Sequence, residues 1–374
     1  MKSVVVLIVL HLYISVCVAQ SSNPLFVVIV NDKRGYIDGT GKIVIEPRFA
    51  GAGHFSEGLA SVAVTDDGYA EGYIDETGKI VIEPKWDTAG EFSEGVAWVG
   101  FDQAKQEIKI GNRTFYSSPT HSFDYKFGLI DKSGKYIVEP IYSHVRDFSD
   151  GLAAVKAKEG KFGFIDKTGK LVIEAKFDSA GSFSEGLAWI YVEGKYGFIN
   201  KHGQVVIKPR FKMARDFSEG LACVKIGGST LEPDFGTHRI TTTESDTNYA
   251  YIDKAGRIAF KLRASDAFSF SEGLARFAQF GKYGDGFVDK TGKVVIPPTY
   301  GGISDFSEGL KFAILDKGEI GFIDKSGSVV LKTEFALAEN FKNGLAWVQD
   351  SLDVMQAKYG YIDKSGKVVW KPTR

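Results

Sequence analysis

The chain has 374 residues, of which 44% are hydrophobic and 25% charged, and its formal net charge is −1. These values are typical of a soluble folded protein. The balanced charge argues against a nucleic-acid partner, which would require a strongly basic surface.

The first 19 residues differ from the rest of the chain. Lys2 is charged, residues 4–18 are almost wholly apolar, and Ala19 is a small residue that suits cleavage before Gln20. This pattern predicts a secretory signal peptide over residues 1–19, and so a secreted protein that is extracellular or periplasmic. The alternative is a membrane anchor, but the apolar run is shorter than the ~20 residues that span a bilayer. We therefore expect no integral membrane span in the mature chain.

From residue 25 to residue 374 the chain repeats one pattern. The stretch Gly163–Ile190, GFIDKTGKLVIEAKFDSAGSFSEGLAWI, is a clear copy. The nine copies begin at Gly35, Gly72, Gly128, Gly163, Gly197, Ala250, Gly286, Gly321 and Gly360. A period of about 35 residues indicates a repeat architecture in which each unit buries its apolar surface on its neighbours. The sequence thus predicts one continuous array.

Each copy opens with a hairpin signal, hydrophobic–Asp–x–Thr/Ser–Gly–Lys, between two β-branched runs. In the clear copy the turn residues are Asp166 and Gly169. Asp can accept a backbone N–H two residues on, and Gly supplies a positive φ. A type I turn closed by a glycine bulge fits this spacing. The recurrent Asp, replaced by Asn200 in the fifth copy, is therefore predicted to shape a turn.

Two further segments complete the copy. A run such as Val205–Phe211 ends in proline and an aromatic residue, and proline marks the exit of a strand or a sheet edge. The motif Phe-Ser-Glu-Gly-Leu-Ala then leads into an alternating run such as Leu187–Val192, which predicts a half-buried strand. Each copy is thus expected to contribute three short strands joined as a meander.

Two insertions interrupt the period, at residues 101–125 and 227–248. Both lie between the Leu-Ala strand and the strand that opens the next copy. Insertions at one point of a repeat fall on one face of the assembly, and this is often the binding face. The first insertion also contains a glycosylation sequon at Asn112.

The combined pattern resembles the WG-repeat family, also called the KWG-repeat family, over about residue 26 to the end. The Lys-Trp-Gly tripeptide of that family is matched here by Lys-aromatic-Gly, with Phe or Tyr in place of Trp. These positions are Lys126-Phe127-Gly128, Lys161-Phe162-Gly163, Lys195-Tyr196-Gly197 and Lys358-Tyr359-Gly360. The resemblance implies a long β-repeat array. It implies no particular activity, because the family has no established common one.

Two architectures are compatible with stacked repeats. Three-stranded meanders could form an open or curved, solenoid-like stack, or they could curl into a closed β-propeller-like ring. Propeller blades usually have four strands, whereas three are predicted here. Neither end of the chain supplies a strand to exchange with the other end. The sequence therefore favours an all-β open or curved stack of nine three-stranded repeats, with the closed ring as the alternative.

No catalytic, cofactor or metal site emerges from the residues. The six His residues show no metal-ligand spacing. A carboxylate recurs in the Phe-Ser-Glu-Gly motif, and paired carboxylates could serve glycoside hydrolysis. A carboxylate present in nearly every copy is better explained by a hydrogen bond to backbone or by a Lys partner. These residues are Glu57, Glu94, Asp150, Glu185, Glu219, Glu272 and Glu308, with Asn343 in the last position.

Three tryptophans and one cysteine share a single strand position of the repeat. Trp98, Trp189 and Trp347 are expected to pack between units, although exposed aromatic residues can also form a platform for sugars or proteins. Cys223, which lacks a partner once Cys17 leaves with the signal peptide, is expected to be a small apolar residue rather than a reactive thiol.

Taken together, the residues predict a secreted, non-enzymatic repeat protein without cofactors. Its expected role is protein or glycan binding, or scaffolding, at or outside the cell surface. A secreted hydrolase acting on polysaccharide and a purely structural element of the cell envelope are the alternatives.

Overall fold

The computed structural model describes residues 23–64, 70–103, 106–110, 113–117, 124–158, 160–226, 248–279, 284–302, 304–315, 318–353 and 356–373. The predicted signal peptide, Asn112 and residues 227–247 of the second insertion lie outside the described residues. The described ranges contain no α-helix, and hence no helix that could cross a membrane.

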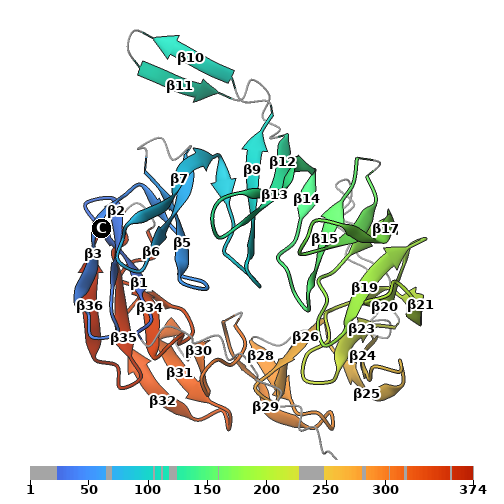
Figure 1. Cartoon of the computed structure of the whole chain (residues 1–374). Helices are drawn as coiled ribbons and strands as arrows, with labels where there is room; N and C mark the ends of the chain where they lie inside the picture. The colour runs from blue at the N-terminus through green and yellow to red at the C-terminus, as the bar shows by residue number, and fades with distance from the viewer. Residues whose placement is uncertain are drawn as a thin grey trace, which may run out of the picture.

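Thirty-six strands are found in these ranges, and all but two of them form nine small antiparallel sheets set around a central axis (Figure 1). The sheets are the blades of a β-propeller. Within a four-stranded blade the strands follow one another from the axis to the rim. We call them the inner, second, third and outer strands.

The strands of blades 1 to 3 are as follows. Blade 1 has β1 (Phe26–Val30), β2 (Lys33–Ile37) and β3 (Ile43–Phe49). Blade 2 has β4 (Gly51–Ala52), β5 (Leu59–Ala63), β6 (Glu71–Asp75) and β7 (Ile80–Trp86). Blade 3 has β8 (Thr88–Ala89), β9 (Val96–Asp102), β12 (Tyr125–Asp131) and β13 (Tyr136–Tyr142).

Blades 4 to 6 each have four strands. Blade 4 has β14 (His144–Val145), β15 (Leu152–Lys156), β16 (Phe162–Asp166) and β17 (Leu171–Phe177). Blade 5 has β18 (Ser179–Ala180), β19 (Leu187–Val192), β20 (Lys195–Asn200) and β21 (Val205–Phe211). Blade 6 has β22 (Met213–Ala214), β23 (Ala222–Lys225), β24 (Asn248–Ile252) and β25 (Ile258–Arg263).

Blades 7 to 9 complete the ring. Blade 7 has β26 (Asp266–Ser271), β27 (Leu274–Ala278), β28 (Asp285–Val288) and β29 (Val294–Tyr300). Blade 8 has β30 (Leu310–Ile314), β31 (Ile320–Asp324) and β32 (Val329–Thr333), with a single bridge from Gly301 to Ile314 in place of an inner strand. Blade 9 has β33 (Leu337–Ala338), β34 (Leu345–Gln349), β35 (Tyr359–Asp363) and β36 (Val368–Thr373).

The first insertion carries the two remaining strands, β10 (Gln106–Ile110) and β11 (Arg113–Ser117). They pair with each other as a hairpin between β9 and β12. In Figure 1 this hairpin stands away from the ring, beyond blade 3.

The closed ring corrects the favoured prediction of an open, three-stranded stack; the alternative, a propeller, is confirmed. The sequence reading missed the inner strand. In blade 5 that strand is only Ser179–Ala180, and a single residue separates it from the aromatic Phe177 that ends the previous outer strand. Two residues cannot show the alternation from which a strand is recognised. Within the described residues, seven blades have four strands and blades 1 and 8 have three.

The predicted turn is confirmed. The Asp166 carboxylate accepts the N–H groups of Thr168 at 2.9 Å and Lys170 at 3.1 Å, and Gly169 has a φ of 81°. The bond from the Gly169 N–H to the Asp166 carbonyl closes the turn. A hydrogen bond from the Thr168 hydroxyl is the main reason that the pKa of Asp166 lies below its ordinary value. The recurrent Asp is thus engaged with its own turn.

The hydrophobic core lies between the blades. One cluster joins Phe164 and Ile173 of blade 4 to Phe183 and Ile190 of blade 5. The Phe164 and Phe183 rings meet edge to face with centroids 4.8 Å apart, a favourable aromatic geometry. The same pairing of a third-strand aromatic residue with the Phe of the next Phe-Ser-Glu-Gly motif recurs around the ring. Each blade therefore buries its faces on both neighbours.

The ring closes where blade 9 meets blade 1, a contact that we call the seam. In blade 1, β1 holds the place of the second strand, and no Phe-Ser-Glu-Gly motif precedes it. Phe26 takes the position that is Ala in most blades, and its ring lies 5.5 Å from that of Tyr361 in blade 9. The Tyr361 hydroxyl donates a 2.9 Å hydrogen bond to the Val27 carbonyl, and the Thr373 hydroxyl donates to the Ile29 carbonyl. The seam is thus closed by side chains and needs no exchanged strand.

Candidate functional site

The recurrent carboxylates connect neighbouring blades. Glu219 of blade 6 accepts the backbone N–H of Gly273 in blade 7 at 3.0 Å and pairs with Lys290 of that blade at 3.0 Å. The same two contacts recur for Glu57, Glu94, Asp150, Glu185, Glu272 and Glu308 with the blade that follows each. The expected contacts with backbone and Lys are therefore confirmed.

These carboxylates are well adapted to that structural position. Each sits in the left-handed region, with Glu272 at a φ of 52°. Burial alone would raise the pKa of Glu272, but bonds from the Lys325 ammonium and the Gly309 N–H outweigh it and hold that pKa below its ordinary value. A serine in the same motif adds a further bond between blades, as from the Ser184 hydroxyl to the Phe217 carbonyl at 2.7 Å.

The three indoles have different surroundings. Trp98 donates from Nε1 to Asp147 of the next blade at 2.8 Å, and its ring meets Phe127 edge to face. Trp189 packs on Tyr196, with the Arg146 guanidinium 5.8 Å from its ring. Trp347 stacks on Tyr359 with ring centroids 5.2 Å apart, and both line a pocket. Trp347 therefore borders a cavity.

That cavity, which we call the seam pocket, encloses about 280 Å³ where blade 1 faces blades 9 and 2. Its lining residues are Phe26, Val27, Val28, Ile29, Ala52, His54, Glu339, Asn340, Lys342, Leu345, Trp347, Tyr359 and Tyr361. One wall is β1 itself. The other lining residues include the aromatic rings of Trp347, Tyr359 and Tyr361 and the polar side chains of His54, Glu339 and Lys342. Aromatic surface with a few converging polar groups is the usual composition of a binding pocket.

The pocket exists because blade 1 has no inner strand among the described residues. In blade 2 the inner strand β4 covers the edge of β5, and equivalent strands cover the second strand in six other blades. Sequence reasoning missed the pocket, since it did not predict inner strands at all. The detectable signal was Phe26, a large residue at a position where most copies have Ala.

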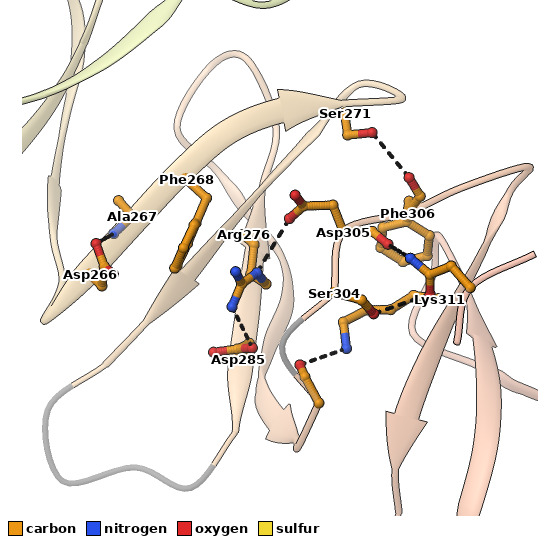
Figure 2. Close-up of polar contacts among 12 residues, drawn as sticks. Asp266, Ala267, Phe268, Ser271, Arg276, Asp285, Ser304, Asp305, Phe306 and Lys311 are labelled. Atoms are coloured by element: carbon orange, nitrogen blue, oxygen red, sulfur yellow. Dashed lines mark hydrogen bonds and ion pairs between the residues drawn. The ribbon is translucent and has the colours of Figure 1, made fainter. Parts of the chain in front are cut away.

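A second unusual group lies between blades 7 and 8 (Figure 2). Arg276 is buried, and its guanidinium bonds to Asp285 at 3.1 Å and to Asp305 at 3.3 Å. The same guanidinium lies 3.5 Å from the centre of the Phe268 ring, and Arg215 lies 4.3 Å from it. Figure 2 shows Arg276 between Asp285, Asp305 and the Phe268 ring of β26, the inner strand of blade 7. The charges of the arginines and carboxylates balance, so the group resembles a structural ion network.

Lys311 is a fully buried neighbour of this network. It replaces the Ala found at the same repeat position in most blades, and its ammonium donates to the Gly302 carbonyl at 3.1 Å and the Phe312 carbonyl at 2.8 Å. Burial lowers the pKa of Lys311 to about 8, although Asp285 and Asp305 oppose this shift. Lys311 thus supplies polar contacts where blade 8 has only a bridge for an inner strand.

This shifted pKa gives a pH-dependent stability. Because the pKa of Lys311 is about 8 in the fold and ~10.4 in an unfolded chain, the unfolded state binds more protons between these values. The free energy of unfolding should therefore rise with pH from about 8 upward, by at most about 1.4 kcal/mol per pH unit. Urea denaturation at several pH values should show this rise relative to Lys311→Met. Parallel profiles of the two proteins would contradict it.

Cys223 and the histidines are the remaining residues that the sequence raised as candidates. Cys223 is buried, and burial raises the pKa of its thiol to about 12, so the thiol stays protonated as expected for an apolar residue. His54 lines the seam pocket, whereas His144 packs against the Phe162 ring. No group of three or more metal-ligating side chains occurs within the part of the chain that the structure describes.

Comparison with known proteins places the repeat in a family. A family model described as "WG containing repeat" matches residues 35–66, 72–103, 127–162, 162–196, 196–229, 249–283, 286–318 and 320–350. These eight matches cover the first eight copies, and the ninth copy, from Gly360, falls outside them. No curated protein sequence matches the chain.

Several solved structures are similar in shape. A crystal structure titled as the eukaryotic initiation factor aligns with a TM-score of 0.57 at 11% identity, over 92% of this chain and 95% of that chain. BamB from Moraxella catarrhalis aligns with a TM-score of 0.40 at 11% identity, over 87% and 93% of the two chains. At such identities similarity concerns the fold alone, and we rely on the first alignment. The protein is a nine-bladed β-propeller that belongs to the WG containing repeat family.

Proposed function

We propose that this propeller is a non-enzymatic binding protein that acts outside the cell and holds a protein or glycan partner at the seam pocket. The observation that carries the proposal is the pocket itself. It is where the repeat pattern stops and where Trp347, Tyr359 and Tyr361 converge with the polar groups of His54 and Glu339. A surface that differs from the other eight blade contacts is suited to recognising one partner.

The carboxylates that could have suggested hydrolysis support this reading. Seven of them accept a backbone N–H of the next blade and pair with its Lys, as Glu94 does with Gly151 and Lys167. A carboxylate with these two partners already has a role in holding the blades together. The hairpin β10–β11, which stands away from the ring in Figure 1, is a second surface outside the repeat pattern.

Export is supported by the N-terminal sequence, in which a charged Lys2 precedes an apolar run. We propose that the exported protein begins near Gln20. An exported protein that retains Met1, as determined by mass spectrometry, would contradict this part of the proposal.

The binding role can be tested with matched tryptophan variants. Trp347→Ala removes an aromatic wall of the seam pocket, whereas Trp98→Ala removes the residue at the same repeat position in blade 3. Truncating a central aromatic residue at an interface costs ~2 kcal/mol or more, or about 30-fold in affinity. We expect that loss for Trp347→Ala only, measured on a glycan array and on immobilised surface proteins of the producing cell.

Circular dichroism should first establish that both variants remain folded. Equal binding by Trp347→Ala and Trp98→Ala would place recognition elsewhere on the ring. Turnover of a polysaccharide by the purified protein would refute the non-enzymatic role.

A further inference from the structure

We propose that the edge of β1 accepts an extended segment of a partner protein as the missing inner strand of blade 1. This inference rests on the proposed function and specifies its partner as a polypeptide. Strand addition to an exposed sheet edge is a recurrent mode of peptide recognition, in which backbone hydrogen bonds supply affinity and side-chain pockets supply specificity.

The hairpin of blade 1 determines which backbone groups face the pocket. β1 and β2 are joined by a two-residue turn at Asn31 and Asp32, both with positive φ, and Val30 pairs with Lys33 next to that turn. In such a hairpin the pair beside the turn exchanges both of its hydrogen bonds, and the pairs then alternate. Val28 therefore bonds to β2, whereas the backbone groups of Val27 and Ile29 point the other way.

The other blades show how a strand would pair with this edge. Val27 and Ile29 correspond to Trp189 and Tyr191 of blade 5. There the Gly181 N–H donates to the Trp189 carbonyl at 2.9 Å, and the Asp178 N–H donates to the Tyr191 carbonyl at 3.0 Å.

The residue just before the second donor in the chain, which is Gly181 in blade 5, is small in the other blades. In blade 5 it is Ala180, and Ala, or once Val, stands at this place in the inner strands of the blades that have one. An incoming segment thus needs two N–H donors, three residues apart, with a small side chain between them.

The hydrogen bond of Tyr361 indicates that the edge of β1 can accept such a strand. Its counterparts Tyr36, Tyr73 and Tyr251 donate to a carbonyl just past the short inner pairing of the next blade: those of Gly53 at 2.8 Å, Gly90 at 2.7 Å and Phe268 at 2.7 Å. Tyr361 has no such carbonyl to reach within the described residues, and it donates to Val27 instead.

An arriving strand would restore the missing acceptor for Tyr361. The Val27 and Ile29 carbonyls, which accept from the Tyr361 and Thr373 hydroxyls, could also take the incoming N–H groups directly, because a carbonyl oxygen has two lone pairs. The Tyr361 hydroxyl therefore need not block the edge.

The dimensions of the pocket favour a short segment. Its volume of about 280 Å³ lies at the lower limit of the ~300–1,000 Å³ typical of small-molecule sites. Ala52 of blade 2 and Leu345 of blade 9 restrict its width, while Glu339 and Lys342 can contact polar residues that flank the paired segment. A stretch of a few residues with a central Ala or Gly fits these limits.

The test uses a synthetic peptide with the sequence of residues 176–182, KFDSAGS, acetylated and amidated, which reproduces the inner strand of blade 5. Its matched control carries an N-methyl group on the glycine that corresponds to Gly181, which removes one donor and changes no side chain. We expect the control to bind about 10-fold more weakly, since losing one hydrogen bond at a buried edge costs ~1–1.5 kcal/mol.

Residue-resolved hydrogen exchange of the full chain supplies an independent readout. The peptide should slow exchange at Ile29, whose counterpart Tyr191 pairs with Ser179 of the inner strand, and leave Val28 unchanged, since that amide already bonds to β2. Tyr361→Phe should weaken peptide binding 3- to 10-fold. Tyr73→Phe, which loses the same kind of bond inside blade 2, should bind the peptide as the wild type does.

Three outcomes would overturn strand addition. One is equal binding of both peptides, which would indicate side-chain docking. The second is protection of the Ile29 amide before any peptide is added, which would mean that the chain covers the edge itself. The third is failure of the peptide to bind while glycans bind through Trp347, which would leave the proposed function intact and refute only this inference.

Discussion

Arg276→Ala is expected to lower the free energy of unfolding by about 3–5 kcal/mol, the usual cost of removing one partner of a buried ion pair. The side chains of Arg276 and Asp285 are only 8% and 11% exposed and lie 3.1 Å apart. Without the guanidinium, the Asp285 carboxylate would remain buried without the ion-pair partner that donates a hydrogen bond to it. Phe268 would also lose the nearer of the two guanidinium groups that lie against its ring. Chemical denaturation should measure the loss.

The control is an ion pair of the same composition at the surface. Arg257 is 81% exposed and pairs with Asp253 four residues earlier, so Arg257→Ala should change stability by less than ~1 kcal/mol. Replacing both buried partners, as in Arg276→Met with Asp285→Leu, should recover much of the loss, because the buried carboxylate that had lost its partner is removed as well. If Arg276→Ala costs no more than Arg257→Ala, the network contributes little to holding blades 7 and 8 together.

Gly41→Ala is expected to destabilise the seam strongly. Gly41 has a φ of 88°, and a Cβ there would lie 2.3 Å from the Val369 carbonyl oxygen of blade 9. Positive φ and a clash with backbone should each cost ~1–3 kcal/mol. We therefore expect a loss of about 2–5 kcal/mol in unfolding free energy. Small-angle X-ray scattering should show a larger radius of gyration if the ring opens.

Gly58→Ala separates the cost of a positive φ from the cost of the clash with backbone. Gly58 has a φ of 84°, but no atom lies within 4 Å of the position that its Cβ would take. This variant should lose only the ~1–2 kcal/mol that left-handed backbone costs a residue with a side chain. Equal losses at Gly41 and Gly58 would mean that blade 1 moves away from blade 9 without cost, contrary to the contacts of Tyr361.

The repeat, its turns and its second, third and outer strands could be predicted because nine copies give the same local evidence. The Asp166–Gly169 turn depends only on residues within five positions of one another. The inner strand could not be predicted in this way. Ser179–Ala180 becomes a strand because Ile190 and Tyr191 lie beside it, and that neighbour exists only after the blade has formed.

The point where the ring closes can be recognised in the sequence, once the structure is known, from charged residues that are missing there. The carboxylate of the Phe-Ser-Glu-Gly motif in one blade pairs with a Lys in the hairpin turn of the next blade. Where two blades do not make this contact, neither the carboxylate nor the Lys is needed. At the seam the carboxylate position holds Asn343 and the turn position of blade 1 holds Gly39. Blade 2, which follows the blade without a Phe-Ser-Glu-Gly motif, has Glu76 where later blades have Lys. Without the pairing rule these exceptions look like random variation.

The candidate site is harder to predict, because its residues meet only across blades. Val27 and Tyr361 are 334 positions apart in sequence and share one hydrogen bond. Lys311 and Phe26 could have been noticed as large residues at an Ala position. Their surroundings, a buried network in one case and a pocket in the other, follow from the neighbouring blades.

The order of the contacts has a consequence for how the chain folds. Bonds between blades such as those from Ser56 to Phe92 and from Ser307 to Phe341 join residues 36 and 34 positions apart. Each new blade can therefore dock on its predecessor soon after synthesis, with low contact order. The seam is different, since Thr373 reaches Ile29 across 344 positions. Until the last blade is made, the Tyr361 and Thr373 hydroxyls cannot bond to β1, so the edge of β1 is fully open to mispairing on the nascent chain.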